Sequence, residues 1–335
     1  MCCRWMSSVK LKSFGNVPCF FLFITLICFL FFGTVIESRA GDGNLYVVST
    51  MTHEVMRYNG STGTSIDTFV SASSGGLTGA AGITFGPDGN LYVCSAITNE
   101  VLQYNGSTGL FIQAFVTAGS GGLGNPYGLA FGPDGNLYVS SYAANAVLRY
   151  NGSTGAFIDA FVPAASGGLS SPTSLTFGPD NHLYVGSSGT QQVLKYNGTT
   201  GAFIGIFVTA SSGGLNYPDG LVFYNGYLYV ASFNSDQVLR YNGASGAFVN
   251  AFVPAGGGGL SGPTGLIFKN GRLYVSSTNT NEVIRFDSAT GAFVDVFVAA
   301  GSGGLNGPGY MAFAPVPVVT TGGGGGGGCF IDSLK

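Results

Sequence analysis

The sequence predicts an all-β fold made of six similar sheets, and three observations support this prediction. The pattern LYVxS recurs every 46 or 45 residues, with its leucine at Leu45, Leu91, Leu137, Leu183, Leu228 and Leu273. Each unit contains four short apolar stretches separated by Gly, Asn and Pro, which is typical of short strands joined by turns. The chain is also 45% hydrophobic and 13% aromatic, a composition too apolar for a disordered protein.

The third unit shows the expected strands in chain order, at 128–131, 137–141, 146–150 and 156–162. The Gly-Pro-Asp-Gly turn at 132–135 joins the first two strands. The Asn-Gly pair at 151–152 accepts positive φ and closes a hairpin, so neighbouring strands are antiparallel. A helix of about 11 residues does not fit between these turns.

A four-stranded unit of this kind buries its faces only against its neighbours, so six of them predict a closed six-bladed β-propeller. The repeat is out of phase with the blade, because the first copy begins at its second strand. A single strand at 309–313 follows the sixth copy. We expect this strand to complete blade one as its innermost strand and to cover an otherwise unpaired edge.

The two ends of the chain differ from the repeats in composition. Residues 1–40 resemble a secretion signal, with basic residues before an uncharged run at 19–36 and small residues at 38–40. The run is also long enough to remain as an uncleaved anchor. The propeller, at 41–316, is then secreted or held in the cell envelope, outside the cytoplasmic membrane. Its own strands are not expected to enter a membrane.

Residues 317–335 form a Gly-rich tail that we expect to be a flexible tether. The glycines before Cys329 resemble the start of a bacterial surface-attachment segment, but the chain stops without the hydrophobic stretch that such segments carry. A plain end with a free thiol is the alternative.

Several columns of residues recur at one position in every unit and are expected to form the core. Phe recurs on the inner strand, at Phe85, Phe131, Phe177, Phe223, Phe268 and Phe313, and on the outer strand, at Phe69, Phe115, Phe161, Phe207, Phe252 and Phe297. The Ser/Gly-rich connections each end in a leucine, which predicts ordered turns rather than linkers: Leu77, Leu123, Leu169, Leu215, Leu260 and Leu305.

A charged column predicts ion pairs across the outer hairpin of each blade. Arg57, Arg149 and Arg285 are expected to face acidic residues, and Gln103 to face Gln113. Cys94 occupies a column of small residues, which indicates a packing role rather than a nucleophile.

Some function classes lack the residues that they require. Basic residues number 12 against 15 acidic ones, which gives nucleic-acid binding no electrostatic basis. The chain has two histidines. His53 and His182 are predicted at opposite ends of a strand and on opposite sides of the ring, so they cannot share a site. No dense acidic loop suits calcium, and neither a metal site nor a cofactor is expected.

The segment PYGLAFGPDGNLYVSSYAANAVLRYNGSTGAFIDAF, at 126–161, and its equivalents resemble NHL repeats and the related streptogramin-lyase-like propellers. The resemblance covers about residues 44–314. It implies the same six-bladed fold, and it leaves function open, because such propellers include both binding platforms and enzymes.

The six copies differ most where the inner strands begin, at the end of the ring that we call the mouth. The candidate ligand-binding residues are there and in the loops on the same face: Tyr127, Thr173, Asp219, Thr264, Tyr310, Asp236 and Asn281. Amides, hydroxyls and an aromatic ring without Lys or Arg suit a neutral polar ligand, such as a glycan or a peptide segment, better than a phosphate.

The sequence therefore favours an exported, monomeric, non-catalytic propeller that binds an unidentified protein or glycan at its mouth. The alternative is a lyase or a lactonase-like hydrolase of the streptogramin-lyase-like group. A third interpretation is a structural matrix protein assembled through its similar blades.

Overall fold

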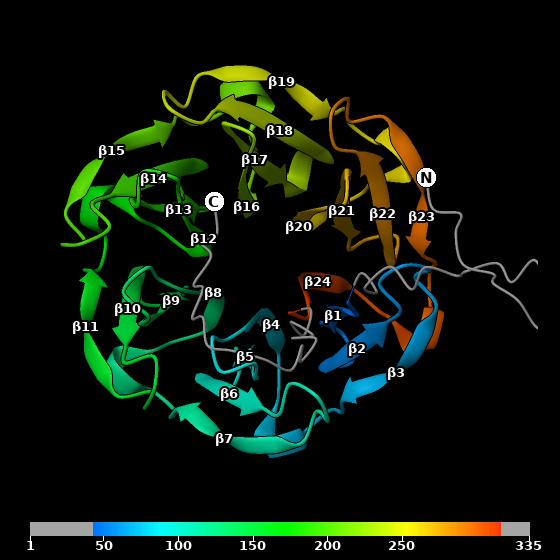
Figure 1. Ribbon diagram of the computed structural model, residues 1–335. Helices are drawn as coiled ribbons and strands as arrows, with labels where there is room; N and C mark the ends of the chain where they lie inside the picture. Colours follow the sequence, from blue (N-terminus) through cyan, green and yellow to red (C-terminus); the bar gives the residue numbers. More distant parts are fainter. Residues whose placement is uncertain (1–42, 316–335) are drawn as a thin grey trace, which may run out of the picture. The chain divides into compact units, whose positions relative to one another are not determined.

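The computed structural model describes residues 43–315, and these form six four-stranded antiparallel sheets arranged in a ring (Figure 1). The predicted six-bladed β-propeller is confirmed. The expected signal segment at 1–40 and the tail at 317–335 lie outside the described residues. Among the described residues, no helix has the length and hydrophobicity needed to cross a membrane.

The strands are numbered in chain order, and blade one is the blade that contains β1. From its innermost strand outward, it contains β24 (Pro308–Phe313), β1 (Leu45–Ser49), β2 (Glu54–Tyr58) and β3 (Ser65–Val70). In the same order, blade two contains β4 (Ala80–Phe85), β5 (Leu91–Ser95), β6 (Glu100–Tyr104) and β7 (Phe111–Val116). Blade three contains β8 (Pro126–Phe131), β9 (Leu137–Ser141), β10 (Ala146–Tyr150) and β11 (Phe157–Val162).

Blade four contains β12 (Pro172–Phe177), β13 (Leu183–Ser187), β14 (Gln192–Tyr196) and β15 (Phe203–Val208). Blade five contains β16 (Pro218–Tyr224), β17 (Tyr227–Ser232), β18 (Gln237–Asn242) and β19 (Phe248–Val253). Blade six contains β20 (Pro263–Lys269), β21 (Arg272–Ser277), β22 (Glu282–Asp287) and β23 (Phe293–Val298). Short 3₁₀ turns follow each outer strand, at η1 (Ser74–Gly76), η2 (Ser120–Gly122), η3 (Ser166–Gly168), η4 (Ser212–Gly214), η6 (Gly257–Gly259) and η7 (Ser302–Gly304), and one more, η5 (Phe233–Ser235), follows β17.

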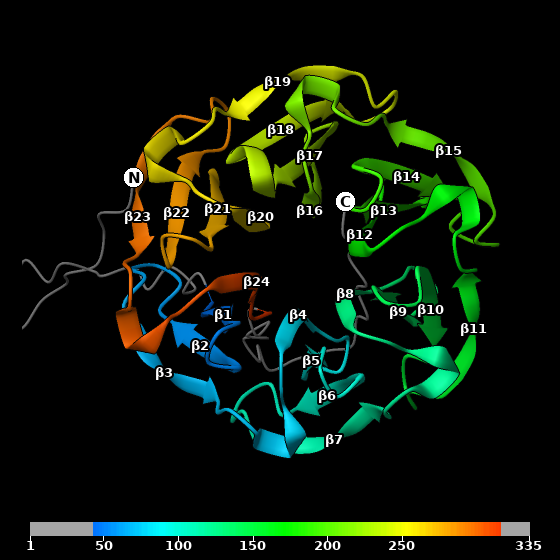
Figure 2. The ribbon, with the colours of Figure 1, turned by 180° about the vertical axis from the view of Figure 1, so that it is seen from behind.

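The last strand closes the ring, as the sequence predicts. β24 pairs antiparallel with β1, with Phe313 opposite Leu45 and Met311 opposite Val47. Figure 2 shows β24 as the innermost strand of blade one, beside β1 from the start of the ring. The two strands come from opposite ends of the repeat, and their pairing gives blade one the same four-stranded sheet as the other five blades.

One aromatic contact recurs at every boundary between blades. In blade two, the ring of Tyr92 lies 4.9 Å from Phe115 on the outer strand of the same blade and 5.1 Å from Phe131 on the inner strand of blade three, both edge to face. Equivalent tyrosines occupy all six blades, at Tyr46, Tyr92, Tyr138, Tyr184, Tyr229 and Tyr274. Edge-to-face pairs contribute about 0.5–1.5 kcal/mol each beyond the area that they bury.

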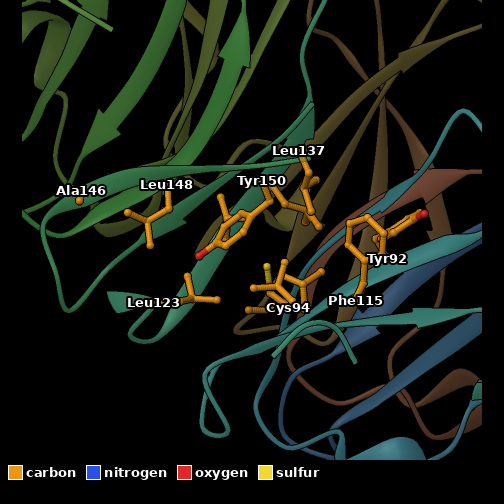
Figure 3. Packing of buried hydrophobic residues seen from close by; sticks show 13 residues of the cluster. Tyr92, Cys94, Phe115, Leu123, Leu137, Ala146, Leu148 and Tyr150 are labelled. Atoms are coloured by element: carbon orange, nitrogen blue, oxygen red, sulfur yellow. The ribbon is translucent and has the colours of Figure 1, made fainter. Parts of the chain in front are cut away.

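Figure 3 shows how side chains fill the space between blades two and three, with Tyr92, Cys94 and Phe115 from one blade and Leu137 and Tyr150 from the other. Cys94 is fully buried, and this burial raises the pKa of its thiol. The residue is therefore a small packing group, as its column indicates.

The Ser/Gly-rich connections are ordered turns that attach each blade to the next, in agreement with their buried leucines. Gly75 in the first turn has φ +60° and lies so close to the Phe111 ring that a Cβ would be 2.1 Å from it. The Tyr104 hydroxyl donates to the Ser74 carbonyl at 2.8 Å. We call this pair of contacts the outer clasp. Two boundaries have only half of it, because Ser65 stands where the other blades have Phe, and Phe286 where they have Tyr.

The predicted charged pairs form across the outer hairpins. Arg57, Arg149 and Arg285 bind Asp67, Asp159 and Asp295. Gln113 donates to Gln103 at 2.8 Å. Lys195 has Gly205 opposite and binds Asp180 at 2.8 Å instead. These pairs contribute to sheet pairing at the outer wall and lie away from the mouth.

Candidate functional site

Every inner strand carries an irregularity just after it begins. In β8, Pro126 pairs with Ser141 and Leu129 pairs with Val139, so three steps along β8 match two along β9. The same shift occurs in β24, β4, β12, β16 and β20. A bulge of this kind changes the direction of a side chain without ending the strand. The variable positions at the mouth are the bulge residues.

Three bulge side chains from alternate blades meet in the centre of the ring. The Tyr310 hydroxyl of blade one donates to Asp219 Oδ1 of blade five at 2.5 Å. The Tyr127 hydroxyl of blade three lies 3.3 Å from Asp219 Oδ2 and donates to it. The two tyrosine rings are 5.7 Å apart and nearly perpendicular. We call this group the central triad.

Asp219 is buried, with 1% of its surface exposed. Burial raises the pKa of Asp219 to about 6, and the two tyrosine hydroxyls oppose this rise because they bind the charged form. The pKa values of Tyr127 and Tyr310 are well above the usual value, first because of burial and then because of the neighbouring carboxylate. Asp219 is therefore charged, and both tyrosines are neutral, at neutral pH.

A cavity of about 290 Å³ opens on the mouth side of the central triad. Tyr127, Tyr310 and Thr264 contribute to its walls, together with the small residues Gly79, Ala80, Ala81, Ala96 and Gly309. Its rim is formed by Thr50, Asn125, Phe233 and Thr278. Asp219 is absent from this lining and is bound by the hydroxyls of the two lining tyrosines. A larger cavity of about 430 Å³ lies at the opposite end of blades one and two, lined by turn residues such as Gly60 and Gly106.

The remaining candidates occupy three different environments. Thr264 reaches the cavity, whereas Thr173 is fully buried and donates to the Pro218 carbonyl at 2.7 Å. Asp236 accepts a hydrogen bond from the Gly262 amide at 2.7 Å, and Asn281 accepts one from the Gly307 amide at 2.6 Å. The structure thus brings together Tyr127, Asp219, Thr264 and Tyr310.

The contacts of Asp236 and Asn281 belong to a repeated column of loop residues. Asn99 and Asn145 make the same hydrogen bond to the next blade, and so does the Nδ1 atom of His53. This column connects the mouth loops at five of the six blade boundaries, which gives its polar residues a structural role that the sequence pattern did not reveal.

Three aromatic residues on the mouth loops were not among the predicted site residues. Phe233 lies on the cavity rim, and Tyr217 lies 5.7 Å from it. Tyr142 lies 6.0 Å from Tyr127. A signal for them was present in a second variable column directly after the second strand of each blade, at Thr50, Ala96, Tyr142, Ser188, Phe233 and Thr278.

The two histidines are in separate structural contacts, as predicted. His53 Nδ1 accepts from the Gly79 amide at the mouth, and His182 Nδ1 accepts from the Gly198 amide at the opposite end. Within residues 43–315, no three His, Cys, Asp or Glu side chains form a group able to hold a metal ion.

Solved structures with the same fold include proteins of different activity. The chain is similar to a nidogen/laminin complex structure, with a TM-score of 0.65 and 14% identity over 82% of this chain and 98% of that one. It is also similar to virginiamycin B lyase from Staphylococcus aureus, with a TM-score of 0.55 and 16% identity over 74% of this chain and 83% of that one. A catalytically inactive variant of that lyase with quinupristin has a TM-score of 0.56 and 14% identity, over 82% of this chain and 93% of that one.

No family model and no curated protein sequence matches this chain. At these identities the similarity establishes the fold alone. The likeness to streptogramin-lyase-type propellers is therefore a likeness of architecture, and the NHL-repeat resemblance stays a prediction.

Proposed function

We propose that this chain is an exported binding module, secreted or held in the cell envelope, that takes a polar group of a protein or glycan into its mouth cavity. The observation that carries the proposal is the central triad beside a cavity of about 290 Å³. The bulge positions carry five residue types, although the surrounding columns repeat. A cavity of this size suits one small group of a larger ligand.

The non-catalytic assignment rests on what the cavity contacts. An acid or base must lie within hydrogen-bond reach of the substrate atom that it serves. The cavity lining of the described chain contains no carboxylate, histidine or basic residue. The ionisable groups of the lining are Tyr127 and Tyr310, whose pKa values are raised by burial and whose hydroxyl protons are donated to Asp219. Both oxygens of Asp219 are bound in this way.

One variant tests whether the cavity is the binding site. Ala81 lines the cavity, and the equivalent position of blade three carries Tyr127. Ala81→Tyr therefore fills the space with a residue that this backbone position accepts elsewhere. The matched control is His182→Asn at the opposite end, where Asn90 occupies the equivalent turn and makes the equivalent bond to Gly106.

Ligand-observed NMR against a library of glycans, short peptides and polar fragments provides the measurement. We expect hits that bind the wild type and the His182→Asn variant and bind at least tenfold more weakly to Ala81→Tyr. If every hit binds Ala81→Tyr as tightly as it binds the wild type, the binding site lies elsewhere and the proposal fails.

The lyase alternative is favoured by the fold of the virginiamycin B lyase structures. Quinupristin, which is bound in one of them, is the direct probe. Conversion of quinupristin to a new product by the purified chain, detected by chromatography with fragment-ion mass spectrometry, would establish an enzyme and replace the binding-module proposal.

A further inference from the structure

Charged residues are divided unequally between the two ends of the described ring. All seven basic residues lie on the third strands, nearer the end away from the mouth, or at the turn between β20 and β21: Arg57, Arg149, Lys195, Arg240, Arg285, Lys269 and Arg272. Of the twelve acidic residues of the described chain, five lie at the mouth end: Glu54, Glu100, Asp219, Asp236 and Glu282. The mouth end thus has five acidic and no basic residues, whereas the opposite end has seven of each.

The cavity lining has few hydrogen-bond donors to offer a ligand. The hydroxyl protons of Tyr127 and Tyr310 are donated to Asp219. Thr50 donates to the Gly307 carbonyl, and Thr278 to the Pro308 carbonyl, both at 2.7 Å. The hydroxyl oxygens keep their lone pairs, so they can still accept hydrogen bonds. Thr264 also donates to the Pro308 carbonyl, which leaves the Asn125 amide at the rim as the side-chain donor of the lining. A ligand with donors of its own therefore fits this lining best.

The aromatic walls also favour a positive group. The faces of Tyr and Phe rings attract cations, most strongly where water is excluded. Tyr127 and Tyr310 donate their hydroxyl protons to a carboxylate, which makes their rings richer in electrons. Phe233 adds a third aromatic side chain at the rim.

We propose that the mouth cavity binds its ligand by an organic ammonium group, which lies against the rings of Tyr127 and Tyr310 while the buried Asp219 carboxylate supplies the opposing charge. This inference rests on the proposed binding function and specifies the chemistry of the ligand. It replaces the neutral ligand expected from sequence, because the burial of a charged Asp219 bound by the two tyrosines was not visible there.

Asp219→Asn is the central variant. It removes the charge, keeps the shape and leaves an oxygen that can accept from a tyrosine hydroxyl. The matched control is Asp236→Asn, which removes a charge from the same face outside the cavity. Asn99, Asn145 and Asn281 stand at the equivalent position and make the same backbone bond.

Calorimetric titration of the purified chain measures binding of butylammonium, choline and Nα-acetyl-lysine methylamide, with 1-butanol as the neutral comparison. We expect at least one ammonium compound to bind tenfold more tightly than butanol. We also expect Asp219→Asn to lose at least tenfold in that affinity and Asp236→Asn less than twofold. The preferred compound distinguishes a free small cation from a lysine side chain of a polypeptide.

The pH dependence provides a second measurement. Tyr127, Tyr310 and Tyr217 are the titratable groups that act on Asp219, and all three stay neutral at acidic pH. Affinity for the ammonium should therefore fall as Asp219 is protonated between pH 7 and pH 5. The Asp219→Asn variant should lack this fall.

The outcomes separate the two proposals. Equal ammonium binding by wild type and a folded Asp219→Asn variant overturns the inference, and so does ammonium binding that survives in Ala81→Tyr. Ala81→Tyr keeps the test valid even if Asp219→Asn fails to fold. If only neutral compounds bind in a manner sensitive to Ala81→Tyr, the ammonium inference fails and the binding module stands. If neither these compounds nor any member of the NMR library binds in that manner, both fail.

Discussion

Between neighbouring blades the same Tyr–Phe contacts recur six times, whereas the first bulge positions at the mouth carry Ala, Tyr, Thr, Asp and Gly. We call the residues packed between blades the wall. These residues repeat because every blade packs against its neighbour in the same geometry. The first bulge positions have the same backbone in every blade but lie outside this repeated Tyr–Phe contact.

The two regions also differ in energetic terms. Wall residues bury apolar surface and stabilise the ring. Asp219 instead buries a charge, which costs stability even with two hydroxyls bound to it. A residue that weakens the fold where its neighbours strengthen it is characteristic of a functional site. The predictions below separate these two kinds of residue.

The largest effect on stability is expected from removing β24, because this strand belongs both to the packed blades and to the mouth. Deletion of residues 309–335 removes most of β24, leaves β1 without its inner partner and takes away Tyr310. We expect the melting temperature to fall by at least about 15 °C, since a loss of several kcal/mol shifts a domain of this size by that much. Deletion of 319–335 is the control and should change it little. Similar melting of the two truncations would contradict the closure of the ring by β24.

Asp219→Asn should stabilise the ring while it weakens binding. The folded pKa of about 6 is above the unfolded one, so the folded chain holds a proton more tightly and loses stability as pH rises from about 4 to 6. Removing the charge should therefore add about 1–3 kcal/mol at pH 8. The gain should shrink by pH 4.5.

Urea unfolding of wild type and variant at both pH values measures this gain, with Asp236→Asn as the control. A variant that is less stable than wild type at pH 8 would show that the Asp219 carboxylate is a structural group.

Changes in the outer clasp should alter stability without altering the mouth. Phe157 packs on Gly121 in the same way as Phe111 on Gly75, and Phe157→Ala should cost about 1–2 kcal/mol. Ser65→Phe supplies the missing ring at the boundary between blades six and one, and should add about 0.5–1 kcal/mol. Chemical denaturation gives both values. Binding at the mouth should stay within twofold of wild type, and a larger change would mean that wall and mouth are coupled.

The smallest effect is expected at the other incomplete clasp. Phe286→Tyr adds a hydroxyl that can donate to the Gly257 carbonyl, as the Tyr241 hydroxyl donates to Ser212 at 2.8 Å. One new hydrogen bond should add about 0.5–1 kcal/mol. Differential scanning calorimetry can resolve this change, and a lower melting temperature would indicate that the position has no room for the hydroxyl.

The repeated part of the molecule was predictable because the six copies can be aligned with one another. Their spacing of 45 or 46 residues was enough to predict the blade boundaries. The Arg57 and Asp67 columns change together from copy to copy, which was enough to predict that these residues lie opposite each other in the hairpin. The ring closure followed from counting strands. The blade boundaries, the hairpin pairs and the ring closure all follow from the periodicity, which is visible in a single sequence that contains six copies.

The central triad was predictable only as a set of unusual positions. The sequence identified Tyr127, Asp219 and Tyr310 but not their meeting, because a bulge decides where each side chain points. Thr173 was predicted to contact the ligand, but at its bulge the hydroxyl points to the next blade and donates to the Pro218 carbonyl. Asp236 and Asn281 make a contact that the sequence did not indicate, since each accepts a backbone hydrogen bond from the next blade.

The three residues of the central triad come from alternate blades, and one of them lies on the last strand of the ring. Asp219 belongs to blade five, and its nearer partner, Tyr310, is on the last strand of the ring. A chain without β24, such as one still emerging from the ribosome, therefore lacks Tyr310 and the complete central triad. The central triad is thus completed only when the last strand of the ring is in place.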